Sequence, residues 1–231
     1  MGLILHIDCA TEKALVCFAK DGEVMDAATN QDQKDHAGFL QTAIQQLAAK
    51  NHIELKNIDA VAVTNGPGSY TGLRVGMASA KGLCYALNKP LLTISTLELL
   101  AIAAIQSSLV FAKNTATYIC PMIDARRMEV FTAIFTGNLK IILPEAPVIL
   151  TQNSFENLLS NHTILFIGNG SNKIKGVITH PNACLDEINI TAKAISYKAN
   201  QLFVNQQFTD LIYSEPNYTK AFVDSSNKKI N

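Results

Sequence analysis

Short apolar segments separated by polar turns dominate the start of the chain. Residues 3–8 and 14–19 each have the length and the β-branched or aromatic content of a strand, and a turn signal at Asp21-Gly22 follows before another extended segment. This pattern predicts an antiparallel meander.

The apolar positions then change to helical spacing. Over residues 34–50 they recur every three or four positions, which predicts an amphipathic helix. A β-prone run at 59–64 leads into a glycine-rich turn, and we predict a second helix over residues 70–87. The sequence Asn88-Lys89-Pro90 is typical of the end of a helix.

The pattern of the first half recurs after residue 117. The strand that ends at Asp8 is matched by a strand that ends at Asp124, and each is followed by a polar break and another apolar strand. The run 163–171 resembles the run 60–69, since each leads from an apolar strand into an Asn-Gly turn. A repeat of about 100 to 115 residues is too long for a solenoid unit and predicts duplicated domains. Chance similarity between strand-turn-strand segments is the alternative.

We therefore predict a two-lobed α/β fold, in which duplicated mixed sheets carry flanking helices. Residues 1–104 form the N-terminal lobe and residues 105–189 a smaller second lobe, with a linker over 103–115. A helix at 190–207 packs back on the first lobe, and residues 208–231 form a C-terminal extension.

Composition agrees with a folded core, since 48% of the 231 residues are hydrophobic and 16% are charged. Lys plus Arg equals Asp plus Glu, at 19 each, so RNA contact requires a local basic patch or a partner. The five cysteines are scattered, and the histidines lack the spacing of metal ligands, which argues against a disulfide framework or a zinc site. There is no signal-peptide pattern and no run near the roughly 20 apolar residues of a membrane helix, so we expect a cytoplasmic protein.

The glycine-rich run at 65–76 reads NGPGSYTGLRVG and is the most distinctive segment. Its glycines permit close backbone approach, and Ser69 or Thr71 can cap the helix that follows. A turn of this kind can bind phosphate through free amides, but the run matches neither the Walker loop nor the dinucleotide fingerprint. Phosphate binding by Gly66, Gly68 and Ser69 and a purely structural turn are both consistent with the sequence.

Small residues recur along the helix after this turn, at Gly72, Gly76, Ser79 and Ala80. Glycine inside a helix costs about 1 kcal/mol relative to alanine, so the pattern suggests close approach of another helix. That helix belongs either to the same chain or to another subunit. For an interface between subunits, formed by this helix and the helix at 34–50, we predict contacts from Phe39, Leu40, Ile44, Leu47, Leu73, Gly76, Ala80 and Leu83.

Asp8 is followed by Cys9-Ala10-Thr11. This arrangement is similar to the phosphate hairpin of actin-like kinases and ATPases, which place a metal-associated carboxylate at this position, although Ala10 stands where they usually have glycine. Asp8 and Thr11 are therefore candidate nucleotide-binding residues. The alternative is that Asp8 only orders the turn.

In the second half, Asp124 is followed by Arg126 and Arg127, which suggests an ion pair or a solvated turn. Lys173 and Lys175 have two interpretations as well, an RNA-facing patch or a solvated turn. Neither pair has a motif that decides between the alternatives.

Together with residues 7–11, 80–83 and Lys89-Pro90, the glycine-rich run resembles the TsaB family of bacterial tRNA threonylcarbamoyladenosine biosynthesis subunits, most strongly over residues 1–100. The resemblance implies the duplicated actin-like fold (ASKHA, RNase H-like) and pairing with the related TsaD through the first two helices. TsaD transfers a threonylcarbamoyl group from its adenylate to the adenosine next to the tRNA anticodon, and the ATPase TsaE joins the assembly.

TsaD-type proteins carry a His-x-x-x-His metal pair in the helix after Lys-Pro. Here those positions fall on Thr96 and Leu100, which are poor metal ligands. We therefore expect a non-catalytic partner subunit without a metal, a homodimer when alone, that reaches tRNA through the complex. We expect no cofactor in the chain itself, with ATP or ADP placed only at a subunit junction. The alternatives are a standalone ATP-binding enzyme or peptidase of the glycoprotease-like group, and a homodimeric binding module.

Overall fold

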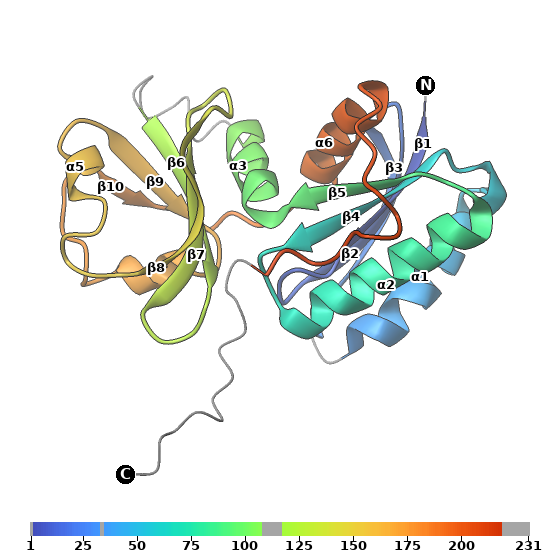
Figure 1. Ribbon diagram of the computed structural model, residues 1–231, viewed down its shortest axis with the longest axis horizontal. Helices are drawn as coiled ribbons and strands as arrows, with labels where there is room; N and C mark the ends of the chain where they lie inside the picture. Colours follow the sequence, from blue (N-terminus) through green and yellow to red (C-terminus); the bar gives the residue numbers. More distant parts are fainter. Residues whose placement is uncertain (1, 33–34, 108–116, 219–231) are drawn as a thin grey trace, which may run out of the picture.

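The computed structural model describes residues 2–32, 35–107 and 117–218. Figure 1 shows two β-sheets, each with its own helices, and helix α3 lying between them. Within the described residues, no helix combines the length and the apolar character needed to cross a membrane.

The first sheet has the strand order β3-β2-β1-β4-β5. β1, β2 and β3 pair antiparallel, which confirms the predicted meander, whereas β1, β4 and β5 pair parallel. Its strands are β1 (Leu3–Asp8), β2 (Ala14–Lys20), β3 (Glu23–Asn30), β4 (Ala60–Gly66) and β5 (Leu91–Ser95). Because parallel strands end at the same edge, Asp8 and the glycine-rich loop after β4 emerge together.

Two helices cover one face of this sheet, α1 (His36–Lys50) and α2 (Tyr70–Leu87), with a short 3-10 helix, η2 (Leu55–Asn57), before β4. Leu40, Ile44 and Met77 pack with the sheet in one hydrophobic cluster. The Ser69 hydroxyl caps α2 by accepting a hydrogen bond from the Gly72 amide at 3.3 Å. Asn88 ends α2 in a left-handed conformation. Both helices and the Ser69 cap were predicted from the sequence.

The second sheet repeats the topology of the first, with the order β10-β9-β6-β7-β8. β6 takes the place of β1 and β9 that of β4, so the predicted duplication is confirmed. Its strands are β6 (Thr117–Asp124), β7 (Glu129–Phe135), β8 (Ile141–Ile149), β9 (Thr163–Ile167) and β10 (Ala183–Leu185). At the positions of α1 and α2 the second half has only short helices, α5 (Glu156–Leu159) and η3 (Ser171–Ile174).

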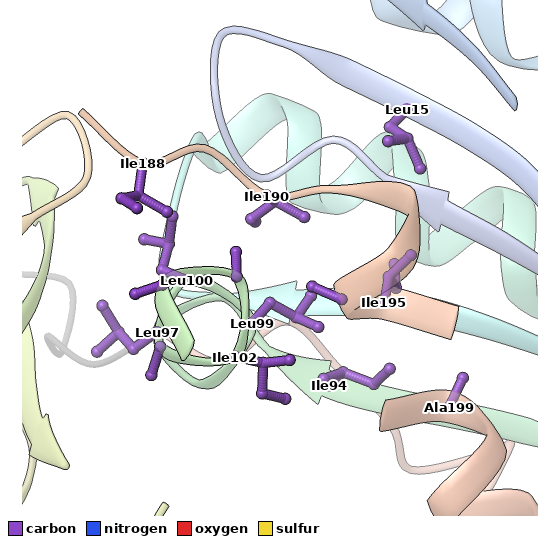
Figure 2. Close-up of a cluster of buried hydrophobic side chains, with 14 of the residues drawn as sticks. Leu15, Ile94, Leu97, Leu99, Leu100, Ile102, Ile188, Ile190, Ile195 and Ala199 are labelled. Atoms are coloured by element: carbon purple, nitrogen blue, oxygen red, sulfur yellow. The ribbon is translucent and has the colours of Figure 1, made fainter. Parts of the chain in front are cut away.

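The last helix of the first half lies between the two sheets, and the last helix of the second half packs on the first sheet (Figure 1). These helices are α3 (Thr96–Gln106) and α6 (Ala192–Val204), which contact each other. Since α3 also packs on strands of both sheets, it is apolar on nearly every side. Figure 2 shows the cluster that results, with labelled side chains from α3, α6, β2, β5 and the segment before α6. Lys198 of α6 forms a 2.6 Å ion pair with Glu98 of α3.

α3 ends at Gln106, so residues 103–106 belong to a helix and their prediction as a linker is wrong. The rest of that predicted linker, from residue 108 onward, lies outside the described residues. The helix predicted at 190–207 corresponds to α6, which contacts β3 and β5 of the first sheet. The division into lobes at residues 104 and 189 stays a prediction.

Candidate functional site

Asp8 ends β1 and is almost completely buried, with 1% of its surface exposed. Its Oδ1 accepts a hydrogen bond from the Ala10 amide at 3.0 Å. Burial raises the pKa of Asp8 to about 6, although the Ala10 N–H and the charge of His36 favour the ionised form. The carboxylate is therefore used to order its own turn, which is the structural alternative offered by the sequence.

The rest of this turn is held by the Thr11 side chain, by His36 of α1 and by the start of α2. The Thr11 hydroxyl donates to the Lys13 carbonyl at 3.4 Å, and the Glu12 carbonyl lies 3.4 Å from Nε2 of His36. The Ser69 amide at the start of α2 donates to the Ala10 carbonyl at 2.7 Å. Thr11 and Ser69, both candidate nucleotide-binding residues, thus each have a partner within the protein.

The glycines of the loop are required by this close approach. A Cβ atom at Gly68 would lie 2.1 Å from the Ala10 carbonyl oxygen, and one at Gly72 would lie 2.1 Å from the Cys9 carbonyl oxygen. Both distances are far below van der Waals contact, so only glycine fits. The structure therefore supplies a packing reason for the motif that does not depend on a bound phosphate.

The C-terminal segment covers the other side of the loop, a contact that the sequence did not reveal. The Asn217 amide donates to the Asn65 carbonyl at 2.7 Å, and a Cβ atom at Gly66, where φ is +121°, would lie 2.8 Å from the Asn217 carbonyl oxygen. Nε of Arg74 donates to the Tyr218 hydroxyl at 2.9 Å, and its guanidinium lies 4.0 Å from the centroid of the Tyr70 ring.

Asp124 is the counterpart of Asp8 in the second sheet. Its Oδ1 accepts from the Arg126 amide at 2.6 Å and from Nζ of Lys173 at 2.7 Å. Partial burial opposes ionisation, but the hydrogen bonds from Lys173 and Arg126 outweigh it and lower the pKa of Asp124. Of the two alternatives for Arg126 and Arg127, the structure has the solvated turn, since both are exposed, and the ion-pair partner of Asp124 is Lys173 from η3.

Hydrogen bonds join the two halves. Nδ2 of Asn169 donates to both carboxylate oxygens of Glu12, at 2.9 and 3.1 Å, and Oδ1 of Asn169 accepts from the Asp124 amide at 3.0 Å. Glu145 of β8 accepts from the Ser95 hydroxyl at 3.1 Å and from Nδ2 of Asn217 at 2.7 Å. The turns that carry Asp8 and Asp124 are thus connected through Glu12 and Asn169.

Thr96 and Leu100 lie in the first turns of α3, with 0% and 2% of their surfaces exposed. Figure 2 shows Leu100 within the apolar cluster at the junction. A hydrocarbon side chain cannot bind a metal, and a threonine hydroxyl is a weak replacement for imidazole. In the described part of the chain, no group of three His, Cys, Asp or Glu side chains could hold a metal ion. The residues at these two positions therefore do not fit a metal centre.

The predicted interface helices are adjacent, and Nε2 of Gln41 on α1 lies 3.5 Å from Oγ of Ser79 on α2. Their most apolar faces, however, point into the protein. Six of the predicted contact residues are buried and two are half-buried. The buried ones are Leu40, Ile44, Leu47, Leu73, Gly76 and Ala80, and the half-buried ones are Phe39 and Leu83.

A different face of the same helices is open to solvent. On α2 it carries Ala78, Gly82, Tyr85 and Ala86, and on α1 it is uncharged apart from Lys50. Tyr85 is 83% exposed, and a Cβ atom at Gly82 would have no neighbour within 4 Å. The sequence pattern identified the small-residue helix, but could not separate the buried glycines from this exposed one.

Three comparisons relate this structure to known proteins. Residues 24–207 match the family described as "TsaD: tRNA N6-adenosine threonylcarbamoyltransferase". The tRNA threonylcarbamoyladenosine biosynthesis protein TsaB of Escherichia coli is 35% identical over 130 residues, 56% of this chain and 53% of that protein. The protein of the same name from Bacillus subtilis is 26% identical over 178 residues, 76% of this chain and 74% of that protein.

The chain spans about half the length of the Escherichia coli relative that it matches. Among solved structures, YeaZ from Pseudomonas aeruginosa has a TM-score of 0.77 at 22% identity, covering 94% of this chain and 100% of that one. At this identity the similarity establishes the shared fold.

Proposed function

The chain belongs to the TsaD family as one of its TsaB-type members, and on that premise we propose that it is a non-catalytic subunit of tRNA threonylcarbamoyladenosine synthesis. It binds a TsaD-type protein, which carries out the transfer of the threonylcarbamoyl group. The chain's contribution is to bind that protein and order its active cleft.

The open face of α1 and α2 carries this proposal. It combines small side chains, which permit close helix approach, with the exposed ring of Tyr85. The charged residues nearest to it on α2 are engaged elsewhere, since Arg74 binds Tyr218 and Lys81 donates to the carbonyls of Ile212 and Ser214. A partner can therefore cover this face while both cations keep their hydrogen bonds within the chain.

Gly82→Arg tests the docking face. The new side chain meets open space in the isolated chain, and replacing a helical glycine favours the helix by up to about 1 kcal/mol. We expect an unchanged or higher melting temperature, together with a loss of assembly with the TsaD-type protein of the same organism. Size-exclusion chromatography with light scattering measures this assembly.

Gln207→Arg is the matched control, because it adds the same charge at an exposed position after α6. It should assemble like the wild type. Wild-type assembly with loss in Gly82→Arg alone supports the docking face, whereas equal assembly of both variants would move the interface elsewhere. Failure of the wild-type chain to bind any TsaD-type protein would reject the proposed function itself.

We extend the proposal to the rest of the assembly. The same open face forms a homodimer when the partner is absent, and a TsaE-type ATPase and tRNA join through the complex in the cytoplasm. Any ATP or ADP binds at a subunit junction, because the Asp8 carboxylate, the Thr11 hydroxyl and the Ser69 amide already have partners within the chain.

A further inference from the structure

The hairpin between β6 and β7 contains two consecutive arginines in an unfavourable backbone conformation. Arg126 has a φ of +70° and Arg127 a φ of +47°. A left-handed conformation costs roughly 1 to 2 kcal/mol for a residue with a side chain, and hairpin turns of this kind usually contain asparagine or glycine. The fold therefore retains arginine where smaller residues would be less strained.

The turn is held in place by Asp124. Its carboxylate accepts from the Arg126 amide and from Nζ of Lys173, and Lys173 also donates to the Glu129 carbonyl at 2.9 Å. These bonds tie the hairpin to η3. The two arginine side chains extend from a fixed backbone, which lowers the entropy cost of binding through them.

Two cations lie together on this hairpin in a chain whose formal net charge is zero. Arg126 and Arg127 are exposed and have no ion-pair partner in the described part of the chain. On the hairpin and η3, Lys173 pairs with Asp124, so the two arginines outnumber the remaining carboxylate, Glu129. The carboxylate of Glu12, near the same turn, is bound by Asn169. RNA contact in a neutral chain requires a local patch of this kind.

We infer that the Arg126-Arg127 turn contacts the phosphate backbone of RNA. Guanidinium groups bind phosphate oxygens in a bidentate manner, and such contacts position a nucleic acid without reading its sequence. The choice of tRNA as the RNA rests on the proposed function. The chemistry of the site requires only a chain of phosphodiesters.

The double variant Arg126→Asn with Arg127→Gly tests this inference without damaging the fold. Both new residues tolerate positive φ, so stability should be unchanged or higher. We expect the assembled complex to bind unmodified tRNA roughly tenfold more weakly at about 0.1 M salt. The log–log dependence of affinity on salt should become less steep by about 1 to 2, because two phosphate contacts are lost. The control, Lys20→Gln with Lys193→Gln, removes two exposed charges away from the hairpin and should change neither quantity.

Unchanged affinity and salt dependence in the arginine variant would overturn the inference. So would weaker assembly with the partner protein at unchanged tRNA affinity, because the turn would then serve an acidic protein surface. Assembly of the wild type is measured before tRNA is added, which separates this result from failure of the proposed function. The isolated chain with tRNA at low salt, about 0.05 M, gives a second comparison, in which the arginine variant should again bind more weakly.

Discussion

Asp8 and Asp124 occupy the same position in two copies of one fold, yet their surroundings differ. Each ends the central strand of its sheet, and each accepts a hydrogen bond from the amide two residues later. The side chain of Asp8 is buried, whereas that of Asp124 is 43% exposed and forms an ion pair with Lys173. Duplication has preserved the backbone turn, while the neighbouring residues set the chemistry of the carboxylate.

The difference follows from the elements around each turn. In the first half, the glycine-rich loop and α2 cover the turn, and burial raises the pKa of Asp8. In the second half the loop at residues 168–170 and the short η3 take these places, and the hydrogen bond from Lys173 of η3 lowers the pKa of Asp124. A motif at the end of a strand therefore does not define a nucleotide site until the packing around it is known.

The largest expected change in the free energy of unfolding comes from adding a side chain where the glycine-rich loop contacts the Asp8 turn. Gly68→Ala places a Cβ atom 2.1 Å from a backbone oxygen, so we expect a loss of roughly 3 kcal/mol or more in the free energy of unfolding. In the turn after β9 of the second half, Gly170→Ala would place its Cβ atom 2.9 Å from the nearest backbone atom and should cost about 1 to 2 kcal/mol. Urea denaturation measures both.

Gly82→Ala is the control for these substitutions, since it adds a methyl group in open space on α2 and should stabilise by up to about 1 kcal/mol. Equal losses in the free energy of unfolding for Gly68→Ala and Gly170→Ala would show that the two loops are packed equally tightly, against the difference proposed between the two halves.

Asp8→Asn should stabilise the protein at neutral pH. The folded pKa of Asp8, about 6, lies above the unfolded value of 3.8. Burial of the Asp8 carboxyl therefore does not lower the free energy of unfolding below pH 3.8, but lowers it progressively as the pH rises from 3.8 to 6. Two pKa units correspond to roughly 3 kcal/mol, which the amide variant should regain above pH 6, since it keeps an acceptor for Ala10. Thermal unfolding from pH 4 to pH 8 measures the gain, and a loss of stability at pH 8 would contradict the assigned environment.

Asp124→Asn should lower the free energy of unfolding at neutral pH, by less than Asp8→Asn raises it. The pKa of Asp124 is lowered, so its contribution is present above the unfolded pKa and is lost as the pH falls through the folded value. Removing the exposed ion pair with Lys173 should cost less than about 1 kcal/mol, and added salt should reduce the difference from wild type. Stabilisation by this substitution at pH 7 would show that the two carboxylates are alike.

The meander, the helices at 34–50, 70–87 and 190–207, and the duplication followed from hydrophobic spacing, whereas α3 was missed, because it is apolar on nearly every side and has no amphipathic period. Periodicity identifies an apolar face but not what covers it, so Leu40 and Ile44 were assigned to a subunit interface although they form the core. Contacts between segments far apart in the chain could not be predicted from the sequence either, because residue spacing shows only local structure. Asn217 and Glu145 approach each other across 72 positions in the sequence, and Lys173 reaches Asp124 across 49.

The measurement that tests the central claim most directly is formation of threonylcarbamoyladenosine in unmodified tRNA, followed by mass spectrometry. Reactions contain the TsaD-type and TsaE-type proteins of the same organism, ATP and threonylcarbamoyl-adenylate, with this chain added as wild type, Gly82→Arg or Gln207→Arg, or omitted. We expect the modified nucleoside with the wild type and Gln207→Arg, and little with Gly82→Arg or without the chain. Equal modification in the reaction that lacks the chain would contradict its role as a required subunit.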